Sequence, residues 1–224
     1  MTRLSVVMPA LNEAAGINTT LQRLAPWRAR GVEVIVVDGG SQDSTAEAAA
    51  SGANKVLAGP RGRAQQMNAG AAVAKGQTLL FLHADTQLPT HADTLIEQAL
   101  AGGRAWGRFD VRIEGSSPML RVVAAMMNLR SRCSGIATGD QAIFVRADVF
   151  MQLGGYADQP LMEDIELSRR LLAVSRPACL RQQVVTSGRR WQTHGVWRTI
   201  FLMWRLRWRY WRGETPEALA QAYR

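Results

Sequence analysis

The sequence has few cysteines and no long apolar run. Its two cysteines, Cys133 and Cys179, stand far apart and form no Cys-x-x-Cys pair. We therefore expect two buried thiols in a reducing compartment. No stretch reaches the roughly 18 uncharged apolar residues that a membrane-spanning helix needs. The apolar run after Met1 is too short for a signal sequence. We expect a cytoplasmic protein.

The sequence also lacks internal repeats and low-complexity segments. Hydrophobic residues make up 47% and charged residues 20% of its 224 residues, which is ordinary for a globular protein. This length is sufficient for one domain, or for one domain with an appendage.

Most of the chain carries almost no net charge, and the excess of positive charge is concentrated at its end. Residues 167–224 contain 12 basic and 2 acidic residues, and residues 1–166 are close to neutral. Five of the seven tryptophans lie between Trp191 and Trp211. This asymmetry predicts that the end of the chain meets something anionic: a membrane surface, a nucleic acid or a phosphate-bearing ligand.

Apolar runs alternate with helical patterns over the first hundred residues. The predicted strands cover residues 4–8, 32–38, 55–58 and 78–82. Helical stretches between them predict a doubly wound, mostly parallel sheet of the α/β class. The second part is less regular, with a strand at 106–113, a polar loop that enters another strand over 139–145, helices at 119–130 and 163–173, and an outer strand at 178–186.

The strand at 78–82 ends on His83 and Asp85. Positions two apart in an extended chain point to the same side, so this pair could grip a divalent metal that carries a diphosphate. The alternative is a solvated strand end, where Asp85 starts a turn and caps the next helix.

The last predicted helix, residues 196–212, is amphipathic. At 100° per residue, Arg198, Arg205, Arg209 and Arg212 share one narrow face, and aromatic and aliphatic residues fill the remaining arc. This pattern is typical of a helix lying in a membrane interface. A helix packed on the domain with an exposed basic stripe is the alternative. No nucleic-acid-binding motif is present, and we expect no nucleic-acid partner.

Four different motifs, each of them at or near the end of a predicted strand or the start of a helix, follow one another along the chain. They are Met8-Pro9-Ala10-Leu11-Asn12-Glu13, Val36-Val37-Asp38-Gly39-Gly40-Ser41, His83-Ala84-Asp85 and Met162-Glu163-Asp164. Together they resemble the inverting nucleotide-sugar glycosyltransferases of family 2, which have the GT-A fold. The resemblance covers about residues 4–195. It implies a GT-A domain at 1–195, with a nucleotide-sugar half at 1–103 and an acceptor half at 104–195. The basic, Trp-rich residues 196–224 lie beyond the resemblance and are predicted from their own pattern to be an amphipathic helical tail.

The resemblance also assigns roles to particular residues. It implies that the nucleotide-sugar is bound by Pro9, Asn12, Glu13, Asp38, Gly62, Arg63, Asn68 and Asp85. Mn or Mg is expected on Asp85, with His83 replacing the first aspartate of the family's Asp-x-Asp motif and with His194 as a further ligand. The family usually has a second acidic residue after the one that matches Asp38, where this chain has Gly39.

On the acceptor side, the resemblance implies that Asp164 is the base that takes the proton of the acceptor hydroxyl, with Glu163 beside it. Asp140, Gln141, Arg190 and Trp191 are the implied acceptor-binding residues. The expected reaction is metal-dependent, inverting transfer from a UDP-sugar to a hydroxyl acceptor, with a lipid-linked compound as one candidate acceptor. Two alternatives stay open: a catalytically impaired nucleotide-binding or membrane-adaptor protein, and a sugar nucleotidyltransferase.

Overall fold

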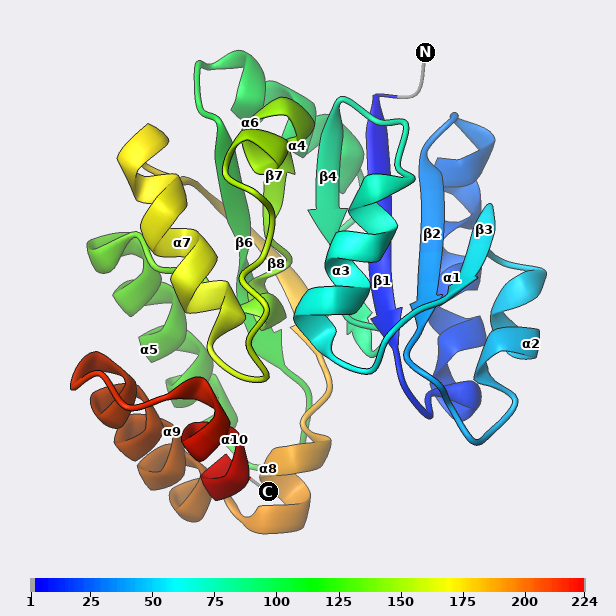
Figure 1. Ribbon diagram of the computed structural model, residues 1–224. Helices are drawn as coiled ribbons and strands as arrows, with labels where there is room; N and C mark the ends of the chain where they lie inside the picture. Colours follow the sequence, from blue (N-terminus) through cyan, green and yellow to red (C-terminus); the bar gives the residue numbers. More distant parts are fainter. Residues whose placement is uncertain (1–2, 224) are drawn as a thin grey trace.

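The computed structural model describes residues 3–223, which form one curled sheet with helices on both faces (Figure 1). Within these residues the strands are β1 (Leu4–Ala10), β2 (Glu33–Asp38), β3 (Lys55–Ala58), β4 (Thr78–Phe81), β5 (Thr86–Gln87), β6 (Trp106–Ile113), β7 (Phe144–Arg146) and β8 (Ala178–Thr186). The helices are α1 (Ala14–Ala29), α2 (Thr45–Ala50), α3 (Arg63–Ala72), α4 (Ala92–Ala101), α5 (Met119–Ser134), α6 (Ala147–Gln152), α7 (Glu163–Val174), α8 (Arg189–His194), α9 (Val196–Trp211) and α10 (Pro216–Tyr223), with a 3₁₀ turn, η1, at Gly139–Gln141.

The strand order is β3-β2-β1-β4-β7-β6-β8-β5. The first four of these strands are parallel, and β7 runs antiparallel to both of its neighbours. The predicted doubly wound, mostly parallel sheet is therefore confirmed. Ala10 is paired with Asp38, and Val7 with Phe81, so the carboxyl ends of β1, β2 and β4 lie at one edge of the sheet.

Side chains alternate between two cores, one on each face of the sheet. Val6 and Met8 of β1 belong to a core with residues of α1, α4 and α5. Val7 points the other way, into a core with residues of α3, α6 and α7. This period of two is what a strand buried on both faces requires.

The second half of the sheet differs from the prediction at its edge. The strand predicted at 178–186 forms as β8, but it is not the outer strand. It lies between β6 and the two-residue β5, which follows a turn closed by a 3.0 Å hydrogen bond from the Thr86 amide to the His83 carbonyl. The prediction missed β5 because two residues are too few for a period to show.

The end of the chain forms two helices where the sequence predicted one. Gly213, at φ +89°, turns the chain between α9 and α10. Both helices pack on the body of the protein, where Leu206 and Leu219 are buried against Met162 and Ile165. Among residues 3–223, no helix combines the length and the apolar character that crossing a bilayer requires.

The prediction that both thiols are buried is wrong. Cys133 is exposed near the end of α5, and Cys179 of β8 is half-buried. No local pattern predicts the exposure of Cys133, because the outward face of α5 is itself apolar.

Candidate functional site

The four motifs converge on the carboxyl edge of the parallel strands. The loops after β1, β2 and β4 leave the sheet there, which is where open α/β sheets bind their ligands. The start of α7 reaches the same place from the second half of the chain. Arg63 Nη1 of α3 lies 3.6 Å from Glu163 Oε1 of α7, so the two halves meet across this edge.

The loops after β1 and β2 are tied to each other. Asn12, at φ +54°, donates its amide to Ser41 Oγ at 2.8 Å, and its Oδ1 accepts from the Gln42 amide at 2.8 Å. The Glu13 amide donates to Thr45 Oγ1 at 2.9 Å. A positive φ at a non-glycine residue is strained, and here the cross-loop hydrogen bonds hold it.

Asp38 ends β2 and is buried. Its Oδ2 accepts from the amides of Gly40 and Ser41 at 3.1 and 3.0 Å, and its Oδ1 accepts from the Ser41 hydroxyl. The carboxylate therefore fixes the loop that follows it. Pro9, inside β1, is likewise buried and pairs with Val37.

Gly39 stands where the family usually has an acidic residue, and a side chain at this position would displace Gln66. A Cβ at this position would lie 2.9 Å from the side chain of Gln66. Gln66 is buried, and its Nε2 donates to the carbonyls of Ala10 and Val37 at 2.8 Å each. Gln66 thus bridges β1 and β2 through the space that a residue-39 side chain would enter.

The amino end of α3 brings Arg63 to the site. Gly62, at φ +146°, precedes the helix, and the Arg63 side chain is 52% exposed. Asn68, one turn later, is occupied elsewhere. Its Nδ2 donates to the Tyr156 carbonyl at 2.8 Å, and its Oδ1 accepts from the Tyr156 amide at 2.9 Å.

The His83-Ala84-Asp85 motif faces two different partners. His83 Nδ1 lies 3.5 Å from Asp140 Oδ1, and in the described part of the chain its buried Nε2 has no hydrogen-bond partner. Asp85 Oδ2 accepts from Arg189 at 3.3 Å, and the same guanidinium binds Glu13 at 2.8 Å. Arg189 was not among the site residues predicted from the sequence, where only the Arg-Arg pair at 189–190 marks its position.

The three expected metal ligands do not form a cluster. His194 is exposed at the end of α8, and no three metal-ligating side chains converge among residues 3–223. Asp85 remains a hard oxygen donor, about one-third exposed at the sheet edge. Such a donor fits Mg or Mn only where oxygens of a bound diphosphate complete the coordination shell.

Asp164 lies at the start of α7, after Met162 at φ +68°. Its Oδ2 accepts from the Gly139 amide at 2.9 Å, and its Oδ1 accepts from the Ile165 amide at 2.7 Å. Burial, followed by the charge of Glu163, raises the pKa of Asp164 to about 6, against these two hydrogen bonds, which lower it. A carboxylate with this pKa is matched to general-base work near neutral pH.

The η1 turn supplies Asp140 and Gln141. Burial raises the pKa of Asp140, but the hydrogen bond and charge of His83 and the charge of Arg63 bring it below its ordinary value. Gln141 is buried and accepts from the Thr138 amide at 3.2 Å. Asp140 is thus the charged, half-buried member of the pair, and Gln141 shapes the turn.

The two expected acceptor residues after β8 contact the end of the chain and the core. Arg190 donates to the Tyr223 carbonyl at 2.7 Å and lies 3.6 Å over its ring, while Trp191 is half-buried against the sheet core. A further arginine was missed. Arg130 of α5 has two buried nitrogens without a hydrogen-bond partner in the part of the chain that the structure describes. Burial lowers the pKa of Arg130, and the negative charge of Asp164 opposes this shift.

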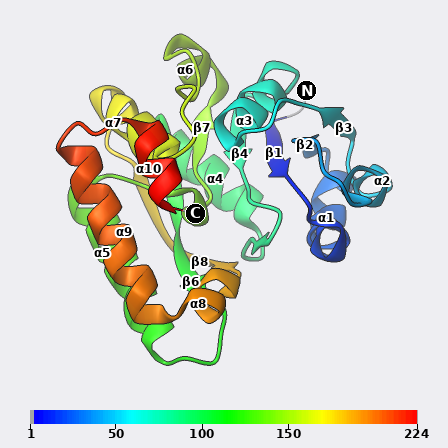
Figure 2. The ribbon, with the colours of Figure 1, turned by 60° about the horizontal axis from the view of Figure 1, so that its bottom comes forward.

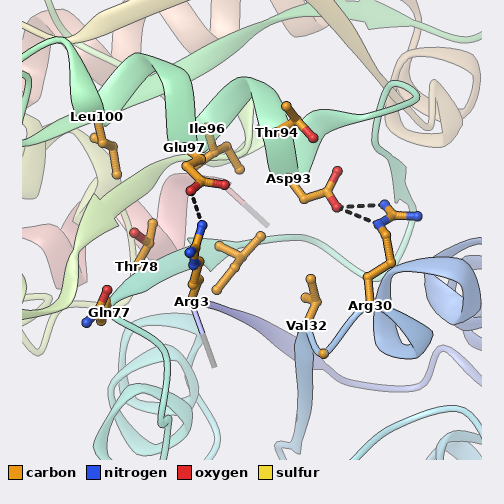
Figure 3. Close-up of a pocket in the computed structure, with 12 residues that line it drawn as sticks. Arg3, Arg30, Val32, Gln77, Thr78, Asp93, Thr94, Ile96, Glu97 and Leu100 are labelled. Atoms are coloured by element: carbon orange, nitrogen blue, oxygen red, sulfur yellow. Dashed lines mark hydrogen bonds and ion pairs between the residues drawn. The ribbon is translucent and has the colours of Figure 1, made fainter. Parts of the chain in front are cut away.

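A cleft of about 780 Å³ lies at the opposite end of the sheet (Figure 3). It is lined by the starts of β1 and β4 and by α4, and ion pairs of Arg3 with Glu97 and Arg30 with Asp93 border it. None of the residues singled out from the sequence lines this cleft.

Comparisons with known proteins bear on this arrangement. A family model described as "Glycosyl transferase family 2" matches residues 5–135. A crystal structure of S. aureus TarS 1–349 matches with a TM-score of 0.66 at 17% identity, covering 84% of this chain and 61% of that one. Matching structures of TarS 1–349 in complex with UDP-GlcNAc and with UDP are 17% and 18% identical, have TM-scores of 0.66, and cover 83% of this chain.

This chain spans about 60% of the length of those TarS 1–349 chains. The likeness establishes the shared fold. No curated protein matches the sequence.

Proposed function

Because the chain belongs to glycosyl transferase family 2, we propose that it transfers a sugar from a nucleoside-diphosphate donor to a hydroxyl acceptor, with inversion at the anomeric carbon. The observation that carries this proposal is the position of Asp164, whose pKa of about 6 fits a general base and which lies opposite Arg63 of the nucleotide half. A uridine diphosphate sugar is the proposed donor, in line with the UDP-GlcNAc and UDP bound by TarS.

In the proposed reaction, Asp164 takes the proton of the acceptor hydroxyl while that oxygen attacks the anomeric carbon. The bond between this carbon and the diphosphate oxygen breaks, and the nucleoside diphosphate leaves with the bonding electrons. The two amides that hold the Asp164 carboxylate fix its direction. Asp140 is proposed to bind an acceptor hydroxyl, and Glu163 to orient Arg63 through their ion pair.

The leaving diphosphate needs positive charge around it. Arg63, half exposed at the start of α3, and Arg189, which touches both Glu13 and Asp85, are proposed to bind its oxygens. Asp85 is the proposed protein ligand of Mg or Mn, with His83 and His194 as secondary candidates. Such an ion supplies Lewis-acid stabilisation of the leaving group.

A donor screen tests this proposal. The purified protein is incubated with Mn, a panel of nucleotide-sugars and simple hydroxyl acceptors, and released nucleoside diphosphate is measured. Release that requires one uridine diphosphate sugar is the expected outcome. If no nucleotide-sugar is turned over, and UDP does not bind, the glycosyltransferase proposal is wrong.

Two observations favour the non-catalytic alternative. Asp85 is engaged by Arg189, and no three metal-ligating side chains converge among residues 3–223. An adaptor of this kind would bind UDP and release no product from any donor, so the same screen separates the two functions.

We also propose that the nucleotide half (1–103) and the acceptor half (104–195) keep the roles that the family resemblance implies; the role of the tail (196–224) is proposed from its own sequence pattern. The tail is proposed to bring a cytoplasmic enzyme to the inner face of an anionic membrane and to a lipid-linked acceptor. Arg198, Arg205 and Arg212 are exposed on α9 and support this, whereas Arg209 forms an ion pair with Glu214.

A further inference from the structure

Helix α5 turns an apolar stripe towards solvent. Val122, Met126 and Leu129 are 54, 57 and 56% exposed and, at spacings of four and three residues, lie on one side of the helix. Ala125 and Cys133 are exposed as well. A surface helix of a globular protein normally places polar side chains outward. The opposite side of α5 is already used, since it packs on the sheet.

Helix α9 carries a second stripe of the same kind. Its members are 58–71% exposed and follow each other at spacings of four and three residues: Trp197, Phe201, Trp204, Trp208 and Trp211. Three exposed arginines each follow one of the tryptophans directly: Arg198, Arg205 and Arg212. The inner side of α9, with Thr199 and Leu206, is buried against the protein.

The two helices are neighbours. Figures 1 and 2, which differ by a 60° turn, both show α5 alongside α9. Val196, at the start of α9, packs on the same core as Val123 and Met127 of α5. Neither helix contains an aspartate or a glutamate. Two outward stripes, one aliphatic and one aromatic with an arginine border, thus lie on neighbouring helices.

We propose that α5 and α9 form a single surface that binds an anionic lipid bilayer. The α5 stripe enters the acyl boundary, the rings of α9 lie at headgroup depth, and the three arginines bind lipid phosphates. This inference rests on the proposed membrane role of the tail and extends it to a second helix. Two helices, unlike one, also fix how the protein is rotated on the membrane.

Charge favours lipid over a second copy of this chain as the occupant. In a two-fold symmetric dimer the same patch meets itself, so the arginine borders of the two copies would face each other. No carboxylate on either helix could pair with them. Lipid phosphates supply the missing negative charge.

The proposed surface also places the membrane close to Glu163 and Asp164. The inner side of α9 packs against Met162 and Ile165, which flank Glu163 and Asp164. A helix with its side chains is about 10 Å thick, so the bilayer surface lies roughly that far from the proposed base. The acceptor class that fits this distance is a hydroxyl compound on a membrane lipid.

The test compares three proteins for sedimentation with phosphatidylglycerol-containing vesicles and with phosphatidylcholine vesicles. The α5 variant carries Val122→Gln, Met126→Gln and Leu129→Gln, which removes the apolar stripe without adding charge. The matched control carries Met151→Gln and Val174→Gln, which are 61 and 49% exposed on other helices. We expect the parent and the control to bind the anionic vesicles equally, and the α5 variant to bind at least about tenfold more weakly.

Equal binding of the α5 variant and the parent would overturn the two-helix surface and leave α9 alone. A fluorophore on Cys133, in a Cys179→Ser protein, gives an independent readout: its emission should shift to the blue on vesicles, and an unchanged spectrum on bound protein contradicts the proposal. Sedimentation without lipid should show a monomer. A dimer that the α5 substitutions dissociate would identify the surface as a self-association interface instead.

The α5 variant should bind UDP as the parent does, since no substituted residue contacts the nucleotide half. Failure of UDP binding in every protein would count against the proposed glycosyltransferase function and not against the membrane surface, which is measured without a donor.

Discussion

The two sides of the site differ in how their polar groups are used. On the nucleotide side, Asn12, Asp38 and Gln66 are each engaged in two or more hydrogen bonds that hold loops and strands together. On the acceptor side, Arg130 has two buried nitrogens without partners in residues 3–223, and Asp164 has a raised pKa. The nucleotide side is therefore a preorganised frame, and the groups free to respond to a ligand lie across from it.

The two sides are joined by the ion pairs of Arg189 with Glu13 and Asp85. We expect Asp85→Ala to lower the affinity for UDP in the presence of Mn by about 100-fold or more, since Asp85 is the proposed protein ligand of the ion. His83→Ala and His194→Ala should have smaller effects. Calorimetry measures all three, and unchanged affinity in Asp85→Ala would remove the metal from the account.

The frame itself is tested at Gly39. We expect Gly39→Ala to lower the free energy of unfolding by about 1–3 kcal/mol, because the new Cβ displaces Gln66 and breaks its two hydrogen bonds. Urea denaturation measures this loss. In a Gln66→Ala background the same substitution should cost far less; an equal cost in both backgrounds means that Gln66 is not the obstacle.

On the acceptor side, the raised pKa of Asp164 has a consequence for stability. Its ordinary pKa of 3.8 applies to the unfolded chain, so between 3.8 and about 6 the folded protein binds more protons than the unfolded one, and stability falls as pH rises through this range. Asp164→Asn should therefore stabilise the protein by about 1–2 kcal/mol at neutral pH. The gain should vanish below about pH 4, where both forms are neutral. Urea denaturation at the two pH values checks this, and a gain that is the same at both contradicts the assignment.

Arg189 links the two sides and should have the smallest effect. Arg189→Gln is expected to weaken UDP binding about tenfold, as the loss of one charge-assisted contact to the diphosphate would. Its neighbour is the matched control: Arg190→Gln should leave UDP affinity unchanged, because Arg190 contacts Tyr223. Equal effects of the two substitutions would show a general loss of positive charge.

The sequence predicted the frame well and the acceptor side less well. Short continuous apolar runs located β1, β2 and β4, and polar residues at their ends located the loops, because both signals are local. The contacts of Arg189 with Glu13 and Asp85 join residues over 100 positions apart, so no local period or spacing in the sequence predicts them. The exposed face of α5 was missed for a similar reason: Val122, Met126 and Leu129 have the same spacing as core residues, and only the packed structure shows that they point outward.

The most direct test of whether donor binding and catalysis belong to different sides of the site uses Asp164→Asn. Donor affinity and transfer rate are measured on one sample of this variant. The account predicts an unchanged affinity for the donor and a loss of transfer on the order of 100-fold or more, the typical contribution of a general base. Transfer at the parental rate would show that Asp164 is not the base and would direct attention to Glu163 or Asp140. A loss of donor affinity equal to the loss of transfer would contradict the separation of the two sides.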